Sequence, residues 1–326
     1  MKTRNLLLMA ALAGAVFTGC SNNEELMGTQ QSALPEDGVI RIATQVNRLV
    51  TTRATTAYTG TTLGLYIKPT ETASWDNTSD KYTYPNVVFS TTDGGTTWTQ
   101  NEFTSMLWKG EDVNYVYYAY APANPVAMDD KVTYDLSQQA SQTEVKNDLL
   151  WASDENTASA LVTNQKLNIT FDHALCKVAV EIELGDEFYQ NNVTDNPIQN
   201  VDISTTRISG SLNVLTGKLE ADANATGTLA FAIADDGHTA GTATTHGTYT
   251  TPYIFYAPGS EQFTVTITTT NGRKFGYTHG ESYDFVKGDQ YLIKLKMGKD
   301  VLQLDGITVE DWQEAEMPNG GKLETE

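Results

Sequence analysis

Apolar residues recur at every second position over much of this chain. In the clearest run they are Val178, Val180, Ile182 and Leu184, separated by small or charged residues. Side chains two positions apart lie on the same face of a β-strand, so this run predicts a strand with one buried face. Comparable alternation is present in residues 40–46, 63–67, 167–171, 263–269 and 291–297. Because no amphipathic stretch exceeds three helical turns, the chain is predicted to be all-β.

Turn-forming residues separate the predicted strands. Asn271-Gly272 can supply the positive φ values of a two-residue type I′ turn, so we expect a hairpin between residues 263–269 and a strand through Phe275. Short strands without alternating helices favour antiparallel β-sandwiches. A length of 326 residues is too great for one seven-stranded sandwich, and two sandwiches are therefore expected.

The first twenty residues have the pattern of an export signal. A basic start precedes an apolar run, residues 6–17, that is too short to be a permanent transmembrane helix. The ending Phe17-Thr18-Gly19-Cys20 resembles a bacterial lipobox, although leucine is usual where phenylalanine stands. We expect residues 1–19 to be a signal peptide and Cys20 to be lipidated. The alternative is ordinary signal cleavage with an incidental cysteine.

Charge and reactive side chains exclude several functions. The chain has 41 Asp and Glu against 21 Lys and Arg, so no basic surface for nucleic acid is expected. Cys176 lies among apolar strand residues and is expected to be a small buried side chain. His173 is expected to be a core or turn residue, and His238 lacks the ligand spacing of a metal site. We therefore predict no catalytic residue, metal or cofactor.

Four segments, in this order, resemble landmarks of the fimbrillin family, the type V pilins of Bacteroidetes. The lipoprotein signal is the first, and Leu49-Val50-Thr51-Thr52-Arg53-Ala54-Thr55 is similar to the family's Thr-Arg-Ala segment. The other two are the mid-chain run from Ile169 to Val180, and Phe285 to Tyr291 followed by a closing Val309-Glu310-Asp311-Trp312. The resemblance implies two transthyretin-like antiparallel β-sandwich domains of Greek-key type in tandem.

The resemblance also implies proteolytic processing. Fimbrillins reach the surface as lipoproteins, and a trypsin-like protease cuts after an arginine at the end of the first strand. Here that arginine is Arg53, and the new N-terminus is Ala54. The expected organisation is a signal peptide (1–19), a propeptide with a tether and the first strand (20–53), an N-terminal sandwich (54–168) and a C-terminal sandwich with a terminal strand (169–326).

A sandwich that loses its first strand exposes unpaired backbone groups and an uncovered core. A strand from another subunit can fill the groove, and such head-to-tail contacts build a filament. The family implies a C-terminal donor, here within Val301 to Trp312. That segment is equally suited to be the last strand of the chain's own second domain.

We thus expect a non-enzymatic structural subunit of fimbriae that supports adhesion. Its precursor would be lipid-anchored in the outer membrane, and its partners would be other fimbrial subunits and the processing protease. The alternative is a surface glycan-binding β-sandwich lipoprotein in which Arg53 stays uncut. Exposed aromatic rings would then stack on sugars, although alternate tyrosines would more simply pack into the core. The rings concerned are Trp75, Trp98, Tyr115, Tyr117, Tyr118 and Tyr120.

Overall fold

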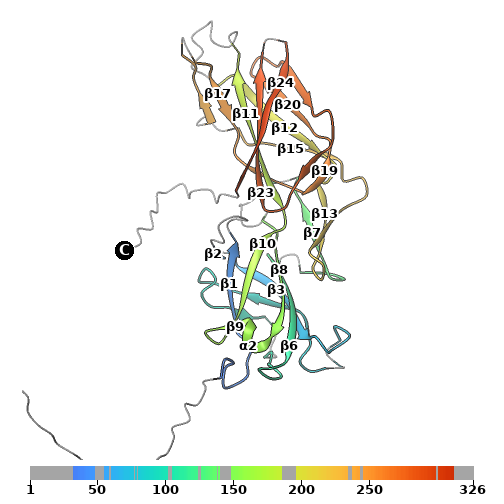
Figure 1. Cartoon of the computed structure of the whole chain (residues 1–326). Coiled ribbons are helices and arrows are strands. Elements are labelled where there is room, and N and C mark those ends of the chain that lie inside the picture. The colour runs from blue at the N-terminus through green and yellow to red at the C-terminus, as the bar shows by residue number, and fades with distance from the viewer. Residues whose placement is uncertain are drawn as a thin grey trace, which may run out of the picture. The chain divides into compact units, whose positions relative to one another are not determined.

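The structure is a computed structural model of the whole chain, and strands dominate it (Figure 1). From Ala33 onward the described residues belong to one compact unit. The residues that the structure describes are 32–47, 55–58, 60–76, 78, 80–101, 105–123, 126–137, 139, 148–185, 196–233, 237–242, 245–298 and 300–311.

The prediction of an all-β protein is confirmed. Within those ranges the α-helical element is α2 (Ala158–Leu161), a single turn between strands β8 (Leu150–Thr157) and β9 (Val162–Thr163). In the described part of the chain, no helix is long and apolar enough to cross a membrane.

The largest sheet has nine strands. Its order is β2-β1-β10-β8-β6-β3-β4-β5, and β9 also pairs with β10. β1 and β10 run parallel, whereas the other pairs are antiparallel. The strands not yet placed are β1 (Ile42–Asn47), β2 (Thr55–Ala57), β3 (Thr62–Pro69), β4 (Tyr84–Ser90), β5 (Thr99–Gln100), β6 (Asn114–Ala121) and β10 (Lys166–His173).

Four smaller sheets contain the remaining strands. One has the order β16 (His238–Thr239), β17 (Thr248–Thr250), β11 (Cys176–Leu184), β23 (Asp289–Met297) and β24 (Leu302–Asp311), with β18 (Ile254–Tyr256) also on β11. The second has the order β15 (Gly227–Ala230), β12 (Ile198–Thr205), β20 (Thr264–Thr269) and β21 (Lys274–Thr278). The others are β14 (Lys218–Ala221), β13 (Ser209–Asn213) and β7 (Lys131–Asp135), and the pair β19 (Gly259–Glu261) and β22 (Tyr283–Phe285).

Buried apolar side chains form two clusters. The first core lies on the nine-stranded sheet and includes Leu63, Ile67, Tyr115, Leu167, Ile169 and Phe171. The second core joins side chains of the smaller sheets and includes Val178, Val180, Ile182, Ile203, Ile267 and Ile293. Alternation along β10 thus predicted its buried face correctly, since Leu167, Ile169 and Phe171 are fully buried. In β11 the predicted residues are buried too, but the expectation of a single buried face was wrong, because Lys177 and Ala179 on the opposite face are also buried.

The tyrosines of β6 are divided between the two cores. Tyr115 and Tyr117 belong to the first core, whereas Tyr120 belongs to the second and Tyr118 packs against it. Opposite faces of one strand are therefore both covered, and this explains the aromatic run in the sequence. Alternate tyrosines pack into a core as expected, and the buried ones cannot form a platform for sugars.

The predicted hairpin at Asn271-Gly272 is confirmed, but its turn type was wrong. β20 and β21 pair from Thr264↔Thr278 to Thr268↔Lys274. The Thr269 N–H donates to the Arg273 carbonyl, so three residues and not two form the loop. Among them only Gly272 has a positive φ, of 81°. The Asn271 side chain accepts hydrogen bonds from Thr269 Oγ1 and the Arg273 N–H. These bonds stabilise a three-residue turn with a bulge at Gly272, and the loop therefore does not form a type I′ turn.

A β-bulge sets the side-chain pattern of β24. Leu295 pairs with Leu304, but Lys294 pairs with Gly306, so Asp305 is the extra residue. Because of this extra residue, the inward positions of β24 are even-numbered before Asp305 and odd-numbered after it. All the apolar residues of β24 therefore lie on one face. These residues are Leu302, Leu304, Ile307 and Val309, and their partners on β23 are buried.

Inserting one alanine between Gly306 and Ile307 is expected to destabilise the six-stranded sheet. The insertion turns Ile307 and Val309 to the outer face, because a shift of one residue exchanges the two faces of a strand, whereas deletion of Asp305 would only make the ladder regular. We expect a loss of about 1–3 kcal/mol in the free energy of unfolding, measured by urea denaturation. Asp305→Ala is the control, because it keeps the bulge and removes only an exposed ion pair with Lys296, worth about 0–1 kcal/mol. Equal losses in the two variants would contradict this role.

Candidate functional site

The first strand of the described chain lies inside its sheet (Figure 1). β1 pairs in parallel with β10 over five positions, from Ile42↔Leu167 to Val46↔Phe171. On its other side, β1 pairs with β2 at three positions. Hydrogen bonds to neighbours on both sides make β1 an integral strand of the sheet, although it precedes nearly all of it in the sequence.

The residues before β1 are also docked. The Ile40 N–H donates to the Met106 carbonyl at 2.8 Å, and the Trp108 N–H donates to the Gly38 carbonyl at 2.9 Å. We use the term leader segment for residues 33–47, from the start of the compact unit to the end of β1. Neighbours far away in the sequence, at positions 106–108 and 167–171, therefore hold the leader segment in place.

The leader segment completes the first core. Leu34, Ile40, Ile42 and Val46 are each at most 6% exposed. The parallel register places Ile42 and Val46 beside fully buried residues of β10, so they point to the same face of the sheet. The alternation in residues 40–46 therefore identified a strand whose apolar side chains close a core.

Polar contacts of the leader segment lie on the opposite face and at its ends. Gln45 Nε2 donates to Thr170 Oγ1 at 2.8 Å, and Asn47 Nδ2 donates to Asp172 Oδ1 at 2.7 Å. Asp37 and Arg41 form an exposed ion pair at 2.6 Å, and the Arg41 guanidinium lowers the pKa of the Asp37 carboxyl to about 2. These exposed contacts contribute little to stability, so apolar burial and the backbone ladder chiefly hold the segment.

Cys20, Arg53 and Ala54 lie outside the described residues, and lipidation and processing remain predictions. The neighbouring strands nevertheless bracket the predicted cut. β1 ends at Asn47, β2 begins at Thr55, and these two residues pair with each other. Arg53 thus falls in the connection between two adjacent strands. A cut in this connection separates the leader segment from the chain that follows.

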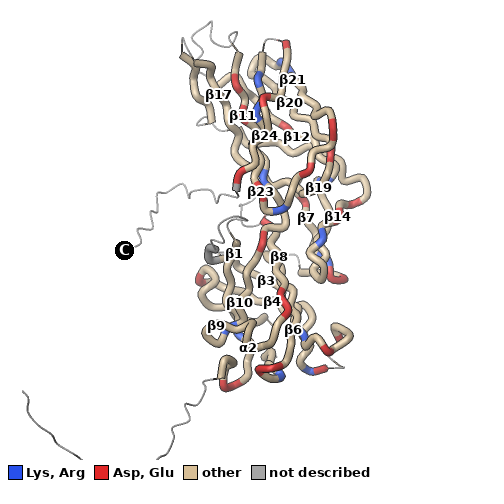
Figure 2. Tube along the Cα trace, viewed as in Figure 1, with Lys and Arg blue, Asp and Glu red and all other residues tan. Residues whose placement is uncertain are grey.

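The C-terminal segment is a strand of the chain's own sheet. β24 pairs with β23 from Asp289↔Asp311 to Met297↔Leu302 and is the edge strand. Figure 2 marks the acidic and basic positions along the chain, and several of them lie on the strands of this sheet. Ion pairs cross its outer face, with Glu183 and Asp305 on either side of Lys296 at 3.8 and 3.1 Å. Of its apolar residues, Leu302 is buried but Val309 is 51% exposed. β24 is thus less deeply buried than β1.

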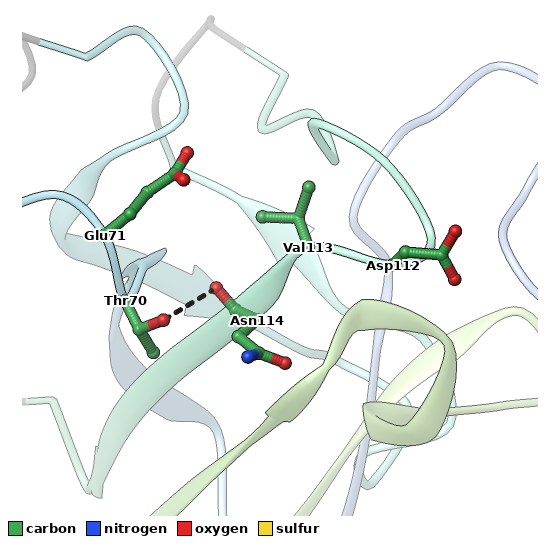
Figure 3. Close-up of a pocket in the computed structure, with 5 residues that line it drawn as sticks. All are labelled: Thr70, Glu71, Asp112, Val113 and Asn114. Carbon is green, nitrogen blue, oxygen red and sulfur yellow. Dashed lines mark hydrogen bonds between the residues drawn. The ribbon is translucent and has the colours of Figure 1, made fainter.

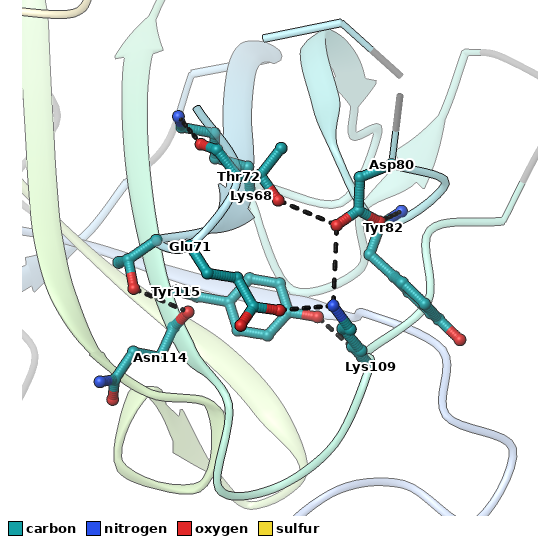
Figure 4. Close-up of polar contacts among 9 residues, drawn as sticks. Lys68, Glu71, Thr72, Asp80, Tyr82, Lys109, Asn114 and Tyr115 are labelled. Atoms are coloured by element: carbon teal, nitrogen blue, oxygen red, sulfur yellow. Dashed lines mark hydrogen bonds and ion pairs between the residues drawn. The ribbon is translucent and has the colours of Figure 1, made fainter. Parts of the chain in front are cut away.

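A hollow lies near one end of β3 and β6. Its lining is small and largely polar, and Figure 3 shows its members: Thr70, Glu71, Asp112, Val113 and Asn114. Lys109 Nζ lies 2.5 Å from Glu71 Oε1 and 3.8 Å from Asp80 Oδ2, and Asp80 also accepts a hydrogen bond from Thr72 (Figure 4). The lysine thus neutralises two carboxylates. Within the described residues, no group of three or more His, Cys, Asp or Glu could hold a metal ion.

The other residues singled out in the sequence have structural contacts. Cys176 is buried with its thiol on the Tyr256 carbonyl, and burial raises the thiol pKa, so its prediction is confirmed. His173 is buried and lies 2.9 Å from Asp148, as expected of a core residue. His238 is part of β16.

Both candidate tryptophans are partly buried. Trp75 packs against Tyr66 and Tyr118 at ring distances of 5.7 and 5.9 Å. Trp98 stacks on Tyr58 at 6.0 Å with nearly parallel rings. These contacts use ring surface that glycan binding would need.

Comparison with known proteins shows the family and the fold. The model of a family described as fimbrillin-like matches residues 52–312. The solved structure of a candidate cell adhesion protein from Bacteroides ovatus is 17% identical, with a TM-score of 0.60 over 85% of this chain and 99% of that chain. A second, from Bacteroides uniformis, is 18% identical with a TM-score of 0.60 over 86% of this chain and 100% of that chain. No curated protein matches the chain.

Proposed function

Because the chain belongs to the fimbrillin-like family, we propose that it is a non-enzymatic structural subunit of cell-surface fimbriae that support adhesion. The observation that carries the proposal is the position of β1. This apolar strand lies inside the sheet, yet only residues 48–54 connect it to the next strand. One cut there can release an essential strand.

Export and processing complete the proposal. The precursor is lipidated at Cys20 and held in the outer membrane, and a trypsin-like protease then cuts between Arg53 and Ala54. What remains is two transthyretin-like sandwiches, predicted at residues 54–168 and 169–326. The predicted boundary lies within β10, whose Ile169 and Phe171 pack in the first core, so the first sandwich would extend to His173. The family match supports the proposed cut, because it begins at residue 52 and thus leaves out β1.

Loss of the leader segment creates an acceptor for another strand. β10 would lose its neighbour from Leu167 to Phe171, and the places of Ile40, Ile42 and Val46 in the first core would be empty. An incoming strand can use the same backbone groups for hydrogen bonds and the same places for its side chains. Because donor and acceptor are different surfaces, the contact does not close on itself and extends into a filament.

We assign the donor to a C-terminal segment of a neighbouring subunit, within Val301 to Trp312. In the described chain most of this segment is β24, so donation requires β24 to leave β23. Its edge position favours this exchange, because its pairing is with one strand and Val301 and Val309 are half exposed. Release of β24 therefore disrupts the core less than release of β1.

The proposal predicts two properties of the protein isolated from its own cells. N-terminal sequencing should give a start at Ala54, and unheated samples should form a ladder of multimers on a denaturing gel, because a buried inserted strand dissociates slowly. Boiling, which unfolds the acceptor, should collapse the ladder to a monomer. A single band that begins at lipidated Cys20 and binds a glycan array would overturn the proposal and support the glycan-binding alternative.

A further inference from the structure

Thr44 is a polar residue in an apolar position of the leader segment. It lies between Ile42 and Val46 on the same face of β1, and the parallel register places it beside Ile169 of β10. Ile169 is fully buried in the first core. Thr44 is half-buried and faces the first core from the middle of the strand that the proposed cut would release.

The hydroxyl group of Thr44 has no hydrogen-bond partner in the part of the chain that the structure describes. Its Oγ1 atom is inaccessible to solvent and forms no hydrogen bond with any described residue. Gln45, the next residue, points to the opposite face and bonds Thr170. A buried hydroxyl without a partner loses its hydrogen bonds to water and gains none in return, so it weakens the folded state.

The loop that contains Gly95 covers this hydroxyl and keeps solvent from it. Gly95 has φ +88°, and a Cβ atom there would lie 2.5 Å from the Tyr58 carbonyl oxygen and 3.7 Å from Thr44 Oγ1. Only glycine allows so close an approach, and the loop therefore closes over Tyr58 and Thr44. Tyr58 itself is buried between Trp98 and Phe171.

We propose that Thr44 lowers the affinity of the leader segment for the groove that it fills beside β10. An incoming strand with an apolar side chain beside Ile169 avoids the unpartnered hydroxyl and binds more tightly than the leader segment. The residue at this register then determines which strand of a second subunit is accepted. This inference rests on the proposed function, because it assumes that β1 can be displaced.

The test compares Thr44 with valine, which has the same shape without the hydroxyl. The chain from residue 21 onward would carry a site for a specific protease in residues 48–54, so that the cut does not depend on Arg53. After cutting, a labelled peptide of residues 33–47 displaces the leader segment, and fluorescence anisotropy follows the exchange. Thr44→Val should slow the exchange about tenfold, equivalent to about 1.4 kcal/mol, and should raise the thermal midpoint of the uncut protein.

A second measurement needs no variant protein. Two peptides of residues 33–47, with Thr or Val at position 44, would compete for the cut wild-type protein, and the valine peptide should bind about tenfold more tightly.

Thr170→Val is the matched control for the exchange measurement. Its hydroxyl already has a partner in Gln45, so its removal should not slow exchange. Equal affinity of the two peptides, or faster exchange of Thr44→Val, would overturn the inference. Either result is independent of whether filaments form in cells.

Discussion

A chain that begins at Ala54 should not form its first core unless the missing strand is supplied. The truncation removes Leu34, Ile40, Ile42 and Val46, all buried in that core. Burial of such side chains contributes about 1.5–3 kcal/mol each, so the loss is about 6–12 kcal/mol. A whole domain is commonly stable by only about 5–15 kcal/mol. The loss also leaves one edge of β10 without its backbone partner.

Near-ultraviolet circular dichroism and urea denaturation would measure this effect. Tyr115 and Tyr117 of β6 belong to the first core, so its collapse should reduce the aromatic signal. A synthetic peptide of residues 33–53 should restore the signal and the unfolding midpoint when it is added in excess. The matched control is a chain that begins at Ala33, which keeps every buried side chain of the leader segment. If the chain from Ala54 unfolded at the midpoint of this control, β1 would not be essential.

Replacing Arg53 with alanine should abolish assembly. A trypsin-like protease needs a basic residue before the cut, so the Arg53→Ala precursor should keep its leader segment and its lipid. The groove then stays filled, and no incoming strand can enter. We expect ladders of multimers to disappear from unheated gels and the full-length lipoprotein to accumulate in the membrane fraction.

Arg48→Ala provides the matched control for this experiment. Arg48 lies in the same connection between β1 and β2 and is also a possible tryptic site. If Arg53 is the processing site, Arg48→Ala should form ladders like the wild type and start at Ala54. If ladders of multimers persisted in Arg53→Ala, processing after Arg53 would not be needed for assembly. If they were lost in Arg48→Ala alone, the cut would be assigned after Arg48.

Local patterns predicted strands well and pairings poorly. Alternation identified the buried faces of β1 and β10, because a period of two is a property of each strand by itself. In β11 it identified one buried face and missed that neighbouring strands also cover Lys177 and Ala179 on the other. The parallel pairing of β1 with β10 joins residues 125 positions apart and has no local signal. The turn at Asn271 differed from the prediction because its side chain bonded the neighbouring backbone, which depends on geometry that the Asn-Gly dipeptide alone does not specify.

The candidate site was predictable to a similar extent. The sequence identified the removable strand and its apolar residues, and it already placed Thr44 at an inward position of the alternation. It could not show that Thr44 lacks a partner, because that depends on Gly95 and Tyr58, which come from a loop and a turn elsewhere in the chain. Likewise, Met106 and Trp108 hold the leader segment through backbone groups, which any residue type could provide.

The pairing of β2 with β1 offers a way to follow strand exchange by fluorescence. In the described chain β2 forms its ladder with β1, and the proposed mature N-terminus would lie one residue before it. Departure of β1 would leave β2 loose beyond the anchored Tyr58, and an arriving strand could pair with it again. A fluorophore on that terminal amine would then brighten or dim with the state of the groove, and polymer growth could be timed subunit by subunit.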